Sequence, residues 1–159
     1  CHNEQSLRVV DLLENDGRGL NLTYEVRMGI VGHTGPYIPE TLEGQIVRRA
    51  DQIAYVNHDI DDAIRAGILT PDAIPKHLRE VLGDKHGVRI NTMVESLIAG
   101  SMDRDELRMT PEVGQAMDEL RTFLFENVYY NPEAIYVPGD FNAELWTETK
   151  LSELITVEV

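Results

Sequence analysis

Apolar residues recur every three or four positions along most of the chain, and this spacing is typical of helices with one buried face. The first such pattern covers about residues 3–14, where Leu7, Val10 and Leu13 share a face. The longest covers about residues 41–66. Shorter helices are predicted at about 23–31, 70–82, 88–99 and 111–128. The pattern therefore predicts an all-α fold.

Residues that start and stop helices bound these segments. The turn formers between Asn15 and Gly19 end the first helix. Thr41 is a good N-cap for the longest helix, and a glycine follows its predicted end at position 67. The Thr-Pro pairs at 70–71 and 110–111 combine an N-cap with a proline at the first helical position. Two further helices are therefore predicted to begin at these pairs.

The character of the chain changes at Asn131. Prolines interrupt the pattern, and residues 131–159 hold six acids against one lysine. A stretch around Leu145 fits an amphipathic helix, whereas the last four residues are more typical of a strand. We therefore divide the chain into a helical domain, residues 1–130, and an acidic tail, residues 131–159, for which the sequence predicts no single structure.

Composition narrows the class of protein. The length of 159 residues fits one domain. The 28 acidic residues outnumber the 14 Lys and Arg, and the net charge of −14 argues against a nucleic-acid surface, which needs clustered Lys and Arg. No apolar run approaches the ~18 residues of a membrane helix. Because Cys1 is the single cysteine and no signal-peptide pattern is present, we expect no disulfide, no cysteine-based zinc site and a cytoplasmic location.

The polar face of the longest predicted helix is the most informative pattern. At ~100° per residue, the polar residues within about a third of its circumference are Arg48, Asp51, Tyr55, His58, Asp59 and Asp62. The apolar side, which we expect to pack, holds Ile46, Ala50, Ile53, Ile60 and Ile64. Solvated faces normally use Glu and Lys, whereas Asp, His and Tyr are poorer helix formers and better ligands. Two interpretations stay open: a solvent-facing surface, or a site for a metal ion and an anionic substrate.

Histidines add further candidates. His58 and Asp59 are adjacent in a helix and point ~100° apart, so they do not form a metal-binding dyad there. His2, close to Glu4, suits either a general acid or base near neutral pH or an exposed terminal histidine. A small basic spot, where a phosphate can sit, is formed by Lys85 and Arg89, which bracket the surface residue His86.

Three segments follow one another in a distinctive order. They are residues 2–10 (HNEQSLRVV), 19–27 (GLNLTYEVR) and 42–63 (LEGQIVRRADQIAYVNHDIDDA). Together they resemble the deoxyguanosine triphosphate triphosphohydrolase-like family of the HD-domain superfamily. With the segments 89–94 and 123–129, the resemblance covers roughly residues 2–132. It implies that the chain is the C-terminal part of an HD-domain-like helical bundle.

The resemblance also implies an activity, which is the hydrolysis of a deoxynucleoside triphosphate to the deoxynucleoside and inorganic triphosphate. It implies a divalent metal ion, such as Mg²⁺ or Mn²⁺, with Asp51 as one ligand. His2 matches the family's active-site histidine and is our candidate for the acid that protonates the leaving 5′-oxygen, with Glu4 as its partner. The implied contacts to the sugar and the phosphates are Gln52, Tyr55 and Asp59.

The family's remaining metal ligands, a histidine and a His-Asp dyad, match positions before His2 that this sequence does not contain. We therefore expect the chain to be an incomplete part of the enzyme and inactive by itself. Family members are commonly oligomers, which implies a homo-oligomer. Two alternatives stay open: a non-catalytic helical module for regulation or assembly, and an HD-type phosphohydrolase that acts on another phosphate ester.

Overall fold

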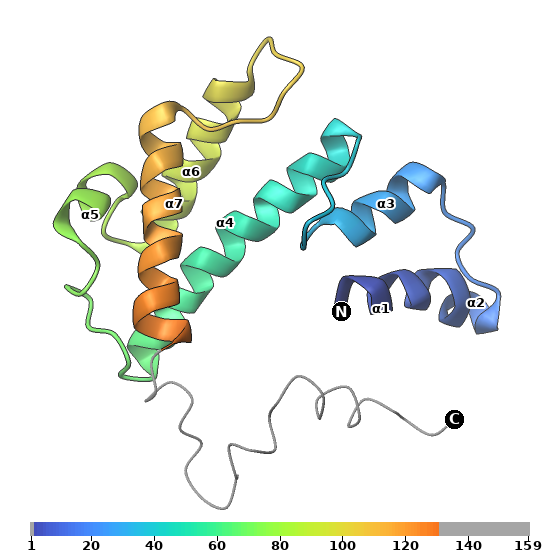
Figure 1. Ribbon diagram of the computed structural model, residues 1–159, viewed down its shortest axis with the longest axis horizontal. Helices are drawn as coiled ribbons and strands as arrows, with labels where there is room; N and C mark the ends of the chain where they lie inside the picture. The colour runs from blue at the N-terminus through green and yellow to red at the C-terminus, as the bar shows by residue number, and fades with distance from the viewer. Residues whose placement is uncertain (1, 131–159) are drawn as a thin grey trace, which may run out of the picture.

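The computed structural model describes residues 2–130, and all the regular structure in that range is helical (Figure 1). The α-helices are α1 (His2–Arg8), α2 (Glu14–Gly17), α3 (Tyr24–Gly32), α4 (Leu42–Arg65), α5 (Lys76–Leu82), α6 (His86–Ser101) and α7 (Pro111–Leu124). The π-helical turns η1 (Val9–Leu13) and η2 (Phe125–Tyr129) continue α1 and α7. The predicted all-α fold is confirmed. The helix and strand predicted beyond Asn131 lie outside the described residues.

Helix α4 links two groups of helices (Figure 1). Helices α5, α6 and α7 form one group, in which α6 and α7 pack against the C-terminal half of α4 and α5 packs against both. In the other group, α3 packs against α4 and α1 packs against α3. A single helix therefore contacts both groups.

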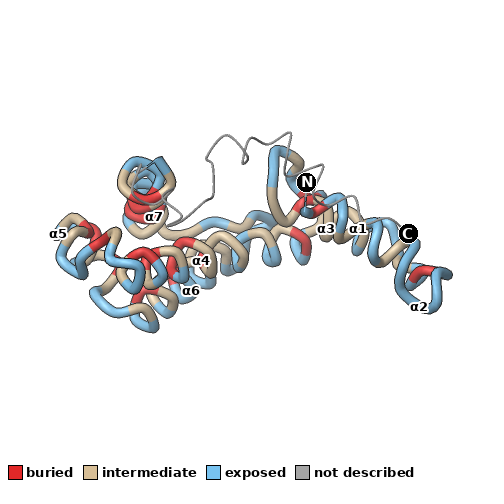
Figure 2. The backbone as a smooth tube through the Cα atoms, turned by 90° about the horizontal axis from the view of Figure 1, so that it is seen from below, coloured by how far each residue is buried: buried red, intermediate tan, exposed pale blue. Residues whose placement is uncertain are grey.

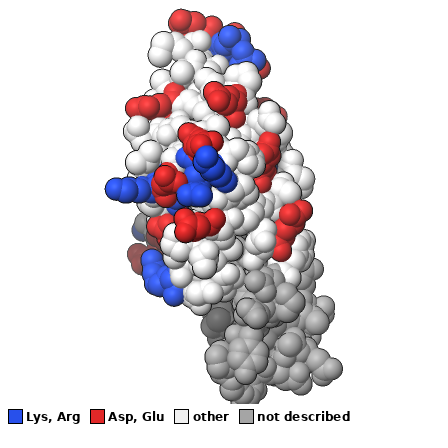
Figure 3. All heavy atoms as spheres, turned by 90° about the vertical axis from the view of Figure 1, so that its left-hand side faces the viewer, with Lys and Arg blue, Asp and Glu red and all other residues white. Residues whose placement is uncertain are grey.

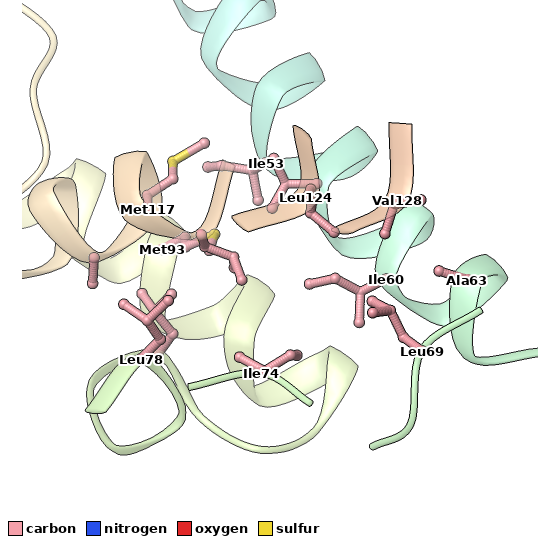
Figure 4. Close-up of a cluster of buried hydrophobic side chains, with 14 residues drawn as sticks. Ile53, Ile60, Ala63, Leu69, Ile74, Leu78, Met93, Met117, Leu124 and Val128 are labelled. Carbon is pink, nitrogen blue, oxygen red and sulfur yellow. The ribbon is translucent and has the colours of Figure 1, made fainter. Parts of the chain in front are cut away.

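The hydrophobic core lies in the group formed by α4 to α7. Within residues 2–130, all the buried aliphatic and methionine side chains come from the stretch between Ile53 and Val128. Side chains from α4, α5, α6 and α7 point toward a common centre (Figure 4), and few buried positions occur in α1 and α3 (Figure 2). The prediction that the apolar side of α4 packs is therefore correct only for its C-terminal half. Ile60 is buried, whereas Ile46 is 49% exposed, because α3 approaches α4 at Gly44 instead.

Local capping sets both ends of α4. The Thr41 hydroxyl accepts a hydrogen bond from the Gly44 backbone N–H at 3.2 Å, which confirms the predicted N-cap. At the other end, Gly67 has a φ of +76°, and the N–H of Ile68 donates to the Ala63 carbonyl at 2.9 Å. Glycine adopts this left-handed conformation without strain, so the predicted end of the helix is also confirmed.

The helix predicted over residues 70–82 is wrong in its first half. The Ala73 N–H donates to the Thr70 carbonyl at 3.0 Å and closes a single turn, and α5 begins only at Lys76. Pro75 explains the difference, because proline has no N–H to donate and disfavours helical backbone at the residue before it. The Thr-Pro pair at this site therefore starts a turn rather than a helix.

Surface charge on the face that carries α5 is mixed (Figure 3). Acidic side chains predominate there, and basic ones are interspersed among them. That face has no continuous basic stripe of the kind that binds nucleic-acid phosphates. Within the part of the chain that the structure describes, no helix is both long and apolar enough to cross a membrane.

Candidate functional site

The polar face of α4 makes side-chain hydrogen bonds where it meets α7 and η2. Arg121 Nε, on α7, donates to the Tyr55 hydroxyl at 2.9 Å. The Tyr129 hydroxyl, in η2, donates to the Asp59 carboxylate. Tyr55 and Asp59 lie about one turn apart, so both bonds belong to one stripe of α4. We call these four residues, Tyr55, Asp59, Arg121 and Tyr129, the α4–α7 face.

Tyr129 is partly buried in this face, and its proton is held tightly. Burial raises the pKa of the Tyr129 hydroxyl above its ordinary value, and the hydrogen bond and negative charge of Asp59 raise it further. Tyr129 is therefore a neutral donor at physiological pH. One phenol occupies only part of the accepting capacity of a carboxylate, so Asp59 retains lone pairs for a hydroxyl group of a ligand.

A hollow of about 400 Å³ opens beside the α4–α7 face. Its walls are formed by Asp59, Asp62, Ala63, Ala66, Ile68, Val128 and Tyr129. This volume falls in the range of small-molecule sites. Because the walls carry two carboxylates and no Lys or Arg, the hollow suits an uncharged group with hydroxyls better than a phosphate.

Asp51 lies one turn before Tyr55 and is partly exposed. No hydrogen bond or ion pair joins its carboxylate to another residue in the range 2–130. Within the same range, no group of three or more His, Cys, Asp or Glu side chains lies close enough together to hold a metal ion. The described residues therefore do not form a metal site around Asp51. The neighbouring Gln52 accepts a hydrogen bond from Arg49 at 3.0 Å.

Arg48, which the helical pattern places on the same polar face, has a structural role. Its guanidinium donates to the backbone carbonyls of Gly32 at 2.9 Å, Tyr37 at 3.1 Å and Gly35 at 2.7 Å. These bonds fasten the loop between α3 and α4 to the side of α4. The guanidinium is therefore used within the fold rather than presented to a phosphate.

His2 lies at the start of α1 and meets the end of α3. Its Nε2 is 3.1 Å from Nε2 of His33. The adjacent Asn3 is buried and donates from Nδ2 to the Val31 carbonyl at 2.6 Å, which anchors α1 to α3. Glu4 follows His2 by two positions, and side chains two apart on a helix do not face each other. The structure places the His33 ring against the His2 ring.

The basic spot predicted around His86 is wrong, because Arg89 is buried. Arg89 Nε donates to the buried Asn57 at 2.9 Å, and another nitrogen of the guanidinium is 3.3 Å from the Asp61 carboxylate. Burial lowers the pKa of the Arg89 guanidinium, and the negative charge of Asp61 counteracts this effect. His86 Nδ1 lies 2.8 Å from the same carboxylate. These side chains connect α4 to α6 and leave no free cation for a phosphate at Arg89.

Sequence reasoning missed Arg121 and Tyr129, the two residues that complete the α4–α7 face. Each directly follows a buried member of the apolar stripe of α7 and η2, namely Leu120 and Val128. A long polar side chain at the border of a packing stripe reaches the neighbouring helix. The position of Arg121 and Tyr129 at the border of the apolar stripe indicates that they contact another helix. The sequence alone does not say which helix packs against α7 and η2.

Comparison with known proteins found relatives but no matching family model. The chain is 56% identical over 133 residues to the deoxyguanosinetriphosphate triphosphohydrolase-like protein of Caldanaerobacter subterraneus subsp. tengcongensis, with 84% of this chain and 39% of that protein covered. Identity to the protein of the same name from Clostridium perfringens strain SM101 is 47% over 137 residues, with 80% and 40% covered. This chain is homologous to the deoxyguanosinetriphosphate triphosphohydrolase-like proteins.

More distant triphosphohydrolase-like proteins match as well. The one from Bordetella pertussis is 33% identical over 180 residues, with 80% of this chain and 47% of that protein covered. The chain therefore spans less than half the length of each of these relatives. The homology confirms the resemblance that the sequence motifs indicated.

Proposed function

We propose that the protein containing this chain hydrolyses a deoxynucleoside triphosphate to the deoxynucleoside and inorganic triphosphate. The α4–α7 face is the observation that carries this proposal, because it gathers a phenol, a carboxylate and a guanidinium on one side of α4. The name of the homologous proteins supports the same reaction class. The described residues are proposed to supply the substrate-binding part of the enzyme.

The sugar is proposed to bind at Tyr55 and Asp59. A deoxyribose has no 2′-hydroxyl, and the space it leaves accommodates the ring of Tyr55. Asp59, already held by the Tyr129 hydroxyl, accepts a hydrogen bond from the 3′-hydroxyl. The neighbouring hollow, with its carboxylates and apolar walls, is compatible with this uncharged part of the substrate.

The triphosphate is proposed to lie nearer the N-terminal half of α4, beside Gln52. Arg121, fixed by its bond to Tyr55, provides a positive charge at the border between sugar and phosphates. Cations positioned in advance are the main way in which proteins stabilise phosphoryl-transfer transition states. In a chain of net charge −14, such a local cation is needed to attract a polyanion.

His2 is proposed to protonate the 5′-oxygen of the departing deoxynucleoside. Glu4, on the same helix, is proposed as a second acidic or basic group of the active site. Asp51 is proposed as one ligand of a divalent metal ion, such as Mg²⁺ or Mn²⁺. The other ligands would come from outside the described residues, which do not complete the site.

The test is to incubate the full-length protein with each of the four common deoxynucleoside triphosphates and separate the products by chromatography. Release of the deoxynucleoside together with inorganic triphosphate is the expected result. A phosphate-detection assay is unsuitable, because triphosphate is the expected product. Formation of a nucleoside mono- or diphosphate would assign a different phosphohydrolase reaction. Absence of turnover with any divalent metal would favour a non-catalytic module.

A further inference from the structure

We infer that His33 is the positioning residue for His2, and that His2 delivers its proton from Nδ1 because His33 occupies its Nε2. This inference rests on the proposed function, in which His2 acts as the general acid. It specifies which atom of the His2 imidazole faces the substrate and gives His33 a part in the reaction.

The hydrogen-bond directions follow from the chemistry of the partners. His33 Nδ1 lies 2.6 Å from the Ile30 carbonyl oxygen. A carbonyl oxygen only accepts, so His33 Nδ1 carries the hydrogen and Nε2 of a neutral His33 is left with a lone pair. The His2 Nε2, 3.1 Å away, therefore donates its hydrogen to His33.

The orientation of His33 is fixed by its surroundings. Arg48 holds the carbonyls of Gly32 and Gly35, which flank His33 in the chain. On the other side of the pair, the buried Asn3 bonds to Val31 and brings the start of α1 against the end of α3. The two rings lie 5.1 Å apart between centroids. The histidine pair is therefore held by contacts on both helices.

The free atom of the pair is His2 Nδ1. No residue in the described range forms a hydrogen bond with it, and the His2 side chain is exposed. In the imidazolium form both nitrogens of His2 carry hydrogen, and the Nε2 hydrogen is engaged by His33. Water attacks the phosphorus and loses one proton to the bulk solvent. As the bond from phosphorus to the 5′-oxygen breaks, the Nδ1 proton of His2 passes to that oxygen. The electron pair of the N–H bond stays on Nδ1, and His2 becomes the neutral Nε2–H tautomer that His33 already favours.

Two substitutions at His33 separate positioning from structural support. The amide of glutamine in His33→Gln occupies the region of Nε2, so its oxygen can still accept from His2. The amide of asparagine in His33→Asn occupies the region of Nδ1, so it keeps the bond to Ile30 and loses the acceptor for His2. Full-length protein is assayed for deoxynucleoside release, and kcat and KM are determined separately.

Positioning predicts that His33→Asn lowers kcat by about tenfold or more with little change in KM, and that His33→Gln stays within about threefold of the unsubstituted protein. A structural role for the bond to Ile30 predicts the reverse order. Equal kcat values for both variants, or the reverse order, would overturn the inference while leaving the proposed hydrolysis intact.

A second measurement does not depend on activity. In full-length protein labelled with ¹⁵N in the histidine rings, the nitrogen shifts report the tautomer of each neutral histidine. We expect His33 as the Nδ1–H tautomer and His2 as the Nε2–H tautomer, with the His2 signals assigned by their loss in His2→Gln. The opposite tautomer at either ring refutes the pairing, even if the protein hydrolyses no deoxynucleotide.

Discussion

Tyr129 and Tyr130 are neighbours in the chain with opposite surroundings. Tyr129 donates to Asp59 and its pKa is raised by burial, whereas the side chain of Tyr130 is 74% exposed. We expect Tyr129 to keep its proton to a higher pH than an ordinary tyrosine does. The phenolate absorbance that is lost in the Tyr129→Phe variant, compared with the unsubstituted protein, identifies the titration of Tyr129.

The raised pKa of Tyr129 also predicts how stability depends on pH. The folded state holds the Tyr129 proton more tightly than the unfolded chain does. The resulting contribution to the free energy of unfolding is therefore fully present below the ordinary tyrosine pKa. It is lost as the pH rises from that value through the higher pKa of the folded state. Denaturant unfolding at a series of alkaline pH values measures this loss. Tyr129→Phe is expected to remove this part of the pH dependence, and Tyr130→Phe to retain it.

Asp51 is proposed as a metal ligand, and its replacement tests that role directly. Because its carboxylate bonds to no other described residue, Asp51→Asn should leave thermal stability unchanged. Metal-dependent deoxynucleoside release by the full-length protein should fall at least about a hundredfold. The matched control is Asp72→Asn, since Asp72 lies in the turn before α5 and its side chain is 91% exposed. Near-normal turnover in Asp51→Asn would reject the ligand assignment.

Between elements, the Arg89 network is the main polar connection of α4 to α6. Arg89→Met would leave the buried Asn57 oxygen without its donor and is expected to destabilise the fold by about 1–3 kcal/mol. Arg65→Met is the control, because the exposed ion pair of Arg65 with Asp62 is worth at most about 1 kcal/mol. Urea unfolding of both variants gives the comparison.

A double variant tests whether the hydrogen bond between Asn57 and Arg89 accounts for this loss of stability. Asn57→Leu combined with Arg89→Met removes both partners, so no unsatisfied oxygen remains at Asn57. We expect the double variant to be less destabilised than the sum of the two single variants. Simple additivity would show that the hydrogen bond between Asn57 and Arg89 does not account for the loss.

Local sequence predicts some helix boundaries of this fold correctly and others not. Thr41 and Gly67 were correctly assigned to the ends of α4, because an N-cap hydroxyl and a left-handed glycine act within a few residues. The start of α5 was not, because Thr70-Pro71 and Pro75 compete within one short stretch.

At the scale of the molecule, the core formed by residues 2–130 is concentrated at one end of α4. We therefore expect unequal consequences for the same substitution in the two groups of helices. Leu120→Ala, at a site with 0% exposure, should cost about 2–5 kcal/mol of unfolding free energy. Leu12→Ala, at a site with 59% exposure, should change it by no more than about 0.5 kcal/mol. Similar losses in denaturant unfolding would contradict this distribution of the core.

The local pattern of the chain was enough to establish the all-α class, most helix ends and the helical face that holds Asp51, Tyr55 and Asp59. These features depend on the 3.6-residue period and on caps, which act over a few residues. The pairing of Tyr55 with Arg121 required the fold, because packing brings together residues that lie far apart in the chain. The same is true of His2 with His33, where docking of α1 on α3, rather than any spacing, brings two rings into contact.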